Sequence, residues 1–153
     1  MLERVVIADA STLIGLANID SIDLLQQLYE QIAITSIVRN EFSLHLPTWI
    51  EVNDNYKEVV FRSLVPQLDI GEASAIALAL ENENSLLIID ERKGRKYARE
   101  MGITITGVTG IIIKAKEQGV IISGKQKLDQ LMESGFRLSK KIYQLALERM
   151  KEA

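Results

Sequence analysis

Short apolar runs alternate with longer amphipathic segments along the chain, and this alternation predicts a sheet covered by helices. Strands buried on both faces read as short, nearly continuous apolar runs. Four such runs lie at residues 4–9, 31–35, 86–89 and 103–106. Residues 46–53 predict either an irregular segment or a short edge strand, because Pro47 interrupts the pattern.

The segments between these runs have the spacing and start signals of helices. We expect helices within residues 10–30, 37–44, 54–65, 72–84, 94–102 and 109–119. Asp20 or Ser21 is the expected cap between two helices in the first segment, and Ser36 is the expected cap of the second. Two further helices are expected after Ser123 and Ser139.

Strands that alternate with helices favour a parallel sheet with helices on both faces. The sequence therefore predicts an α/β fold, a three-layer doubly wound parallel sheet of four to five strands. We expect residues 1–153 to form one domain, with residues 120–153 as a helical C-terminal extension. In such folds, ligands bind beyond the carboxyl ends of the strands, near the point where the strand order reverses.

Four acidic residues occupy positions that this topology brings to the carboxyl edge of the sheet. Asp9 and Asp90 each follow an apolar strand directly, whereas Glu41 and Glu72 lie in helices that follow a strand or a loop. Carboxylates that lie close together repel one another unless a proton or a cation neutralises them. Oxygen ligands without histidine or cysteine suit Mg²⁺ or Mn²⁺. One ion or two could polarise a phosphoryl oxygen and lower the pKa of a water molecule.

Each of these acids also has a purely structural explanation. Asp9 and Asp90 could cap the helices that follow them. Glu72 could interact favourably with the dipole of its helix, and Glu41 could form an ion pair with Arg39 or another neighbour. The four acids in this order are less easily explained as unrelated caps, and together they favour a shared site.

Composition narrows the possible chemistry. The chain has no cysteine and a single histidine, His45, which excludes disulfides, thiolate metal sites and a multi-histidine zinc site within one chain. There is no glycine-rich phosphate loop. An aspartate-nucleophile phosphatase would need an acid where Ser11 stands, and a phosphate-accepting receiver domain would need a lysine directly after residues 103–106. The receiver remains a weaker alternative.

The N-terminal residues and the apolar runs bear on location. The first ten residues contain acids and no long apolar region, unlike a signal peptide. The apolar runs are far shorter than the roughly 20 residues that a membrane-spanning helix needs. We therefore expect a cytoplasmic protein.

Positive charge is concentrated in two parts of the chain. Residues 114–153 contain 9 Lys and Arg against 5 Asp and Glu, a net charge of +4, whereas residues 1–113 contain 9 against 16, a net charge of −7. A second concentration follows Asp90 and comprises Arg92, Lys93, Arg95, Lys96 and Arg99. These bases could contact the phosphates of a polyanion, or they could neutralise acids on a solvated helix.

The ordered set of motifs resembles a PIN domain, the metal-dependent ribonuclease fold of many toxin–antitoxin toxins, and is most similar to an uncharacterised PIN-like branch of predicted nucleic-acid-binding proteins. The resemblance lies in residues 5–19, 32–42, 68–81, 86–121 and 135–143. It implies a ribonuclease site in which Asp9, Glu41, Glu72 and Asp90 hold Mg²⁺ or Mn²⁺ and Ser11 supports them. Arg92, Lys93, Arg95 and Lys96 would bind RNA. An antitoxin protein and a homodimer are the implied partners.

The chain departs from the family pattern at three places. Glu72 stands where aspartate is commoner, and its extra methylene changes the reach to a metal; Asp69, just upstream, could substitute for it. Residues 102–112 and the basic C-terminal helices differ from ordinary toxins. The alternative that these departures leave open is a catalytically inactive PIN-like module that binds nucleic acid or a protein.

Overall fold

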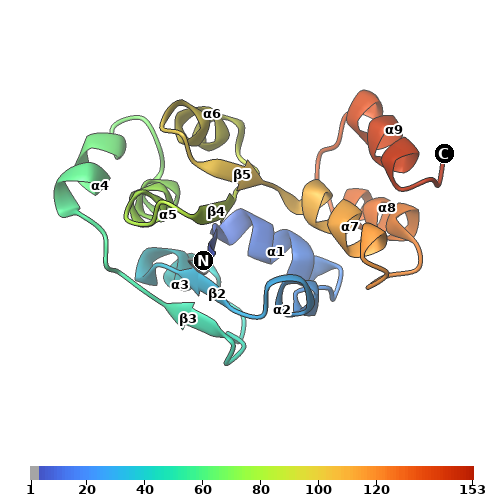
Figure 1. The fold of residues 1–153 in the computed structure, drawn as a ribbon, viewed down its shortest axis with the longest axis horizontal. Helices are drawn as coiled ribbons and strands as arrows, with labels where there is room; N and C mark the ends of the chain where they lie inside the picture. Colours follow the sequence, from blue (N-terminus) through green and yellow to red (C-terminus); the bar gives the residue numbers. More distant parts are fainter. Residues whose placement is uncertain (1–3) are drawn as a thin grey trace.

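The computed structural model describes residues 4–153 and contains a five-stranded parallel sheet (Figure 1). The strands lie in the order β3-β2-β1-β4-β5. Their bounds are Val5–Ala8 for β1, Ile32–Ile34 for β2, Ile50–Val52 for β3, Ser85–Ile88 for β4 and Thr104–Thr106 for β5. The sheet grows from β1 toward β2 and then from β1 toward β4, so the strand order reverses between β1 and β4. The predicted doubly wound parallel fold is confirmed.

Nine helices connect and cover the strands within residues 4–153. They are α1 (Ala10–Asn18), α2 (Asp23–Tyr29), α3 (Ser36–Glu41), α4 (Glu58–Leu64), α5 (Ile70–Leu80), α6 (Arg92–Glu100), α7 (Val108–Glu117), α8 (Gly124–Glu133) and α9 (Lys140–Arg149). In this part of the chain, no helix has both the length and the apolar character needed to cross a membrane.

Alternate residues of the strands pack on opposite faces of the sheet, as strand geometry requires. Val6 and Ala8 of β1 belong to the larger core, which includes residues of α1, α3, α7, α8 and α9. Ile7 faces the other side and packs with residues of α5 and α6. Helices therefore cover both faces of the sheet, and its carboxyl edge is left for side chains that follow the strands.

Two helix starts differ from the expected ones. Thr35, not Ser36, caps α3, because its side chain accepts a hydrogen bond from Val38 N at 3.1 Å. Neither Asp20 nor Ser21 caps α2 with its side chain. Instead Asp20 adopts a left-handed backbone conformation (φ 53°), which turns the chain between α1 and α2.

The C-terminal helices α8 and α9 are part of the larger core through residues that include Leu128, Leu131 and Ala146. Ser123 and Ser139 cap them as expected, each by accepting a hydrogen bond from the backbone N–H three residues later. The extension is thus packed against the α/β domain.

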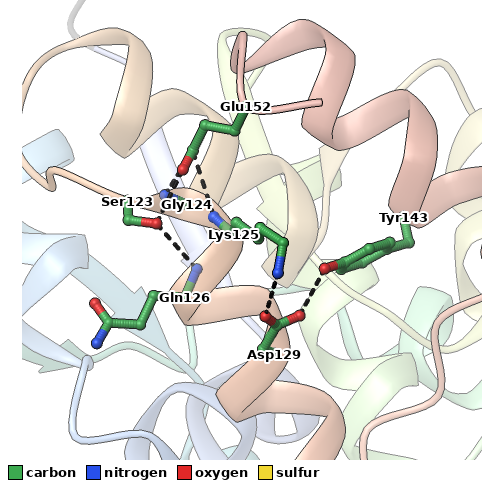
Figure 2. Close-up of polar contacts among 7 residues, drawn as sticks. All are labelled: Ser123, Gly124, Lys125, Gln126, Asp129, Tyr143 and Glu152. Atoms are coloured by element: carbon green, nitrogen blue, oxygen red, sulfur yellow. Dashed lines mark hydrogen bonds and ion pairs between the residues drawn. The ribbon is translucent and has the colours of Figure 1, made fainter.

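Glu152 fixes the end of the chain to the start of α8 (Figure 2). Its carboxylate accepts hydrogen bonds from Ser123 Oγ at 2.9 Å and from Gly124 N at 2.8 Å. Asp129 of α8 accepts hydrogen bonds from Tyr143 Oη of α9 at 2.7 Å and from Lys125 Nζ at 2.9 Å. These contacts hold α8, α9 and the chain end together.

Candidate functional site

Two of the four candidate acids follow neighbouring strands. Ala8 and Ile88 are partners in the register of β1 and β4, so Asp9 and Asp90 leave the sheet at the same edge. The backbone N–H of Asp9 donates to the carbonyl oxygen of Ile88 at 2.9 Å, which extends the pairing by one residue. Both acids therefore stand beside the point where the strand order reverses, the usual position of a ligand site in this fold class.

Asp9 is buried, with 4% of its surface exposed. The pKa of its carboxyl group is raised from 3.8 to about 7, chiefly by burial and to a smaller extent by the negative charges of Asp69 and Glu41. Ser11 Oγ donates a hydrogen bond to Asp9 Oδ2 at 3.3 Å. Asp9 occupies the N-cap position of α1 without a side-chain capping bond, so capping does not explain it.

Glu41 ends α3 and lies against the first turn of α5. A Cβ placed on Gly71 would overlap the Glu41 carboxylate, so only glycine lets the two helices approach in this way. The same helices are joined by a hydrogen bond of 2.7 Å between the hydroxyl groups of Thr35 and Ser74. Burial, followed by the charge of Asp69, raises the pKa of Glu41.

The alternative in which Glu41 pairs with Arg39 finds no support. Arg39 Nη1 donates to the carbonyl oxygen of Phe42 at 3.2 Å, and no ion pair joins it to Glu41 within residues 4–153. The carboxylate of Glu41 therefore faces α5 without a cationic partner in this part of the chain.

Glu72 lies in the first turn of α5 and is 4% exposed. Among residues 4–153, its Oε2 atom has no hydrogen-bond partner. The pKa of Glu72 is raised to about 9, first by burial and then by a hydrogen bond with Asp69 and by the charges of neighbouring acids. A buried carboxyl oxygen without a partner is unfavourable, and a bound cation would satisfy it.

Asp69 belongs to this group, although the sequence pattern gave it a secondary place. Its Oδ1 accepts a hydrogen bond from Glu72 N at 2.9 Å and caps α5. Its charge raises the pKa of Asp9, Glu41 and Glu72. The spacing of an N-cap aspartate three residues before a glutamate is a capping-box pattern, and this signal could have identified Asp69 from sequence.

The carboxylate of Asp90 is engaged separately from this group. Thr12 Oγ1 donates to Asp90 Oδ2 at 2.7 Å, and Val108 N, at the start of α7, donates to Oδ1 at 3.0 Å. Burial raises the pKa of Asp90, while these hydrogen bonds and the charge of Arg95 oppose the rise. Asp90 thus links α1, β4 and α7.

The alternative in which Asp90 caps α6 is wrong. Glu91 is the N-cap of α6, and its side chain accepts a hydrogen bond from Gly94 N at 2.8 Å. Asp90 instead lies against Gly107, where an added Cβ would overlap its Oδ1 atom. Gly94 has a similar role for Glu72, because a Cβ there would come within 3.1 Å of Glu72 Oε2.

The acidic side chains have the chemistry of a site for the predicted divalent metal, but they are not yet arranged around an ion. Within residues 4–153, no three aspartate, glutamate or histidine side chains are placed so that they could hold an ion together. The chemistry of the set nevertheless suits a hard divalent cation, because all donors are carboxylate oxygens that repel one another and one of them is buried and unpaired. Binding would require the carboxylates of Asp9, Glu41 and Glu72 to reorient around the ion.

Comparison with known families decides the classification. A family model for the PIN domain matches residues 5–152. The chain belongs to the PIN domain family. No curated protein and no solved structure gives a significant match. The membership confirms the resemblance seen in the sequence and gives this PIN domain a nuclease-type fold, with the acids described above at the edge where the fold binds its ligands.

The bases that follow Asp90 in this PIN domain fall into two groups. A groove of about 490 Å³ on α6 is lined by Glu91, Arg92, Lys93, Lys96 and Arg99. Arg95 is different, because its Nη1 atom donates to the carbonyl oxygen of Ile89 at 2.8 Å and burial lowers its pKa. The groove starts at Glu91, whose charge reaches Glu72, so it adjoins the acidic group. Arg99 joins the groove because it lies two turns after Arg92 on the same helix.

Proposed function

We propose that this PIN domain is a divalent-metal-dependent endoribonuclease that uses Mg²⁺ or Mn²⁺. Asp9, Glu41, Glu72 and Asp90 are the proposed ligands, and Asp69 adds to their negative charge. The observation that carries the proposal is the buried, unpaired Oε2 atom of Glu72, a group whose pKa is raised to about 9 by burial and by the neighbouring acids. A cation at this edge would neutralise the repulsion among the carboxylates and would give Glu72 Oε2 a partner.

When bound, a divalent ion lowers the pKa of a water molecule and stabilises negative charge on a phosphoryl oxygen. The protein's own residues position the acids for this chemistry. Ser11 orients Asp9 through its hydroxyl group, and Thr12 and Val108 fix the direction of Asp90.

The bases on α6 supply the proposed contacts with RNA. Arg92, Lys93 and Lys96 line the groove beside the acids and would bind phosphates on either side of the cleaved bond. Arg95 already donates one hydrogen bond to the carbonyl oxygen of Ile89, which leaves its other N–H groups for RNA. Such contacts give affinity and register with little sequence preference.

The toxin role, the antitoxin partner, the homodimer and the cytoplasmic location are part of the same proposal. The toxin role and the antitoxin rest on the resemblance of the sequence to toxin-type PIN domains, the homodimer rests on that resemblance and on the charge distribution, and the location is the one expected from the sequence. In a homodimer, the basic C-terminal helices of one chain could lie beside the acidic edge of the other. Complementary charge of this kind steers association and fixes its geometry.

A metal titration with a matched variant tests the proposal. Mn²⁺ or Mg²⁺ should raise the melting temperature of the wild-type protein, because a ligand that binds only the folded state stabilises it. The rise should be lost in Asp9→Asn and kept in Glu83→Gln, a control at an exposed acid in the loop that follows α5. RNA cleavage in Mn²⁺ should follow the same pattern. Equal cleavage by Asp9→Asn and the wild type would refute the proposed site.

A binding module without catalysis is the second candidate. The observation that favours it is that no three metal-binding side chains within residues 4–153 are already in place around an ion. Its signature would be RNA that stays intact in Mn²⁺ but binds to the α6 groove with an affinity that falls as salt concentration rises.

A further inference from the structure

A second cavity lies at the amino edge of the sheet, opposite to the acidic group. Its volume is about 700 Å³, within the range of roughly 300–1,000 Å³ that small-molecule sites occupy. It is lined at the starts of β1, β2 and β3 and by the ends of α2 and α7. The lining residues used below are Arg4, Tyr29, Glu30, Trp49, Glu51 and Lys114.

Two cations line this amino-edge cavity, and neither has an anionic partner among residues 4–153. Lys114 Nζ lies 4.2 Å from the centre of the Tyr29 ring, and no ion pair within residues 4–153 involves Lys114 or Arg4. Burial and the positive charge of Arg4 lower the pKa of Lys114. Two like charges that share a partly desolvated cavity would be stabilised by an anion between them.

The remaining walls suit a ligand that also has a flat apolar part and hydrogen-bond donors. Tyr29 and Trp49 supply aromatic surface, and Val5 and Leu28 supply aliphatic surface. Glu30 and Glu51 supply carboxylate acceptors, although Glu51 already accepts a hydrogen bond from the Gln31 amide at 3.3 Å.

We propose that the amino-edge cavity binds a nucleoside monophosphate. Arg4 and Lys114 would bind its phosphate, and Tyr29 and Trp49 would contact its base. Glu30 and Glu51 would accept hydrogen bonds from base amino or ribose hydroxyl groups. The proposal goes beyond the cleavage site, because none of these residues belongs to the acidic group or to the α6 groove.

The mixture of charges favours this ligand over simpler anions. Inorganic phosphate would satisfy the two cations but would leave the aromatic and carboxylate walls without contacts. A polyanion that ran through the cavity, rather than entering by one end, would bring further phosphates toward Glu30 and Glu51, which would repel them. A ligand with one phosphate and one nucleoside matches both kinds of wall.

Calorimetric titration of the whole chain in EDTA tests the proposal. At least one of the four ribonucleoside 5′-monophosphates should bind, and its nucleoside and inorganic phosphate should each bind about tenfold more weakly or worse. Lys114→Met should weaken binding about tenfold or more, because it removes a charge-assisted contact. Lys114→Arg should retain binding. Lys141→Met, which removes an exposed lysine on α9, is the matched control and should bind like the wild type.

The outcomes are decisive in both directions. The proposal is overturned if no monophosphate binds, if phosphate alone binds as tightly, or if Lys141→Met weakens binding as much as Lys114→Met. A thermal melt of each variant checks that it is folded. Asp9→Asn should bind the monophosphate like the wild type, so a failure of the cleavage proposal would leave this result unchanged.

One further comparison separates the two sources of the same chemical group. A free nucleotide and the 5′ end of an RNA both present a nucleoside monophosphate. A 5′-phosphorylated dinucleotide that binds more tightly than the mononucleotide, and than its 5′-hydroxyl form, would identify an RNA end. Tighter binding of the mononucleotide would identify the free nucleotide.

Discussion

Replacing Asp9 with asparagine should stabilise the metal-free protein at neutral and alkaline pH. The carboxyl group of Asp9 is buried, and burial raises its pKa from 3.8 to about 7. Asparagine has nearly the same shape, and its side-chain oxygen can still accept the hydrogen bond from Ser11. The substitution therefore removes the titratable carboxyl group with little change in packing.

The sign and size of the stability change follow from the linkage between folding and proton binding. Between pH 3.8 and about 7, Asp9 is ionised in the unfolded chain and protonated in the folded one, so the folded state binds more protons and stability falls as pH rises. A shift from 3.8 to about 7 corresponds to about 4 kcal/mol in the free energy of unfolding, at about 1.36 kcal/mol per pKa unit. This is an upper limit, because neighbouring acids share part of the repulsion. The variant should gain this energy at pH 8 and almost none near pH 4.

Urea unfolding in EDTA at pH 4 and pH 8 measures the effect. The stability of Asp9→Asn relative to the wild type should rise by about 2–4 kcal/mol between the two pH values. Glu83→Gln, at an exposed acid, should show no such rise. The reasoning is refuted if the difference between Asp9→Asn and the wild type is the same at both pH values, or if the variant is the less stable protein at pH 8.

Three more predictions concern packing and hydrogen bonding, each measured by chemical unfolding. Gly94→Ala should cost about 1–3 kcal/mol of unfolding free energy, because its Cβ would lie 2.7 Å from Ile89 Cδ1. Gly15→Ala is the control in α1 and should be neutral or stabilising, because the nearest contact of its Cβ would be 3.5 Å away. Equal losses of stability in the two variants would contradict this. Thr12→Val should cost about 1–3 kcal/mol at pH 7 by removing the hydroxyl donor of Asp90, and Thr12→Ser should retain most of the stability. Glu152→Gln should cost about 1 kcal/mol by weakening the cap of α8, a loss that should shrink at high salt.

The architecture was readable from sequence because the central strands β1, β2 and β4 are buried on both faces. Their sequences, such as residues 86–89, are nearly continuous apolar runs, whereas the helices between them bury one face and repeat their apolar residues every three to four positions. The two hydrophobic patterns are therefore easy to tell apart. The edge strand β3 was harder, since a strand with one paired edge tolerates Pro47 nearby and polar residues within it. Sequence left it open between a strand and an irregular segment.

Helix starts were less predictable because several polar side chains compete for the same backbone groups. Thr35 and Ser36 are adjacent and both are good caps, and only the course of the chain leaving β2 decides in favour of Thr35. Asp90 and Glu91 present the same ambiguity at α6. Glu91 takes the cap, which leaves the Asp90 carboxylate free to accept from Val108 N.

Strand order places the acids, but close contacts decide where their carboxylates point. The register of β1 and β4 brings Asp9 and Asp90 to one edge, which the sequence pattern anticipates. The directions of the side chains depend on small residues that the acids lie against, such as Gly71 for Glu41 and Gly107 for Asp90. Such a glycine makes room for an acid only where segments distant in the sequence meet, so its role cannot be recognised from sequence. The sequence therefore could not show that Asp90 is held by α7, apart from the acids that repel one another around Glu72. The proposed metal would therefore have to form its ligand set by moving side chains on a fixed backbone.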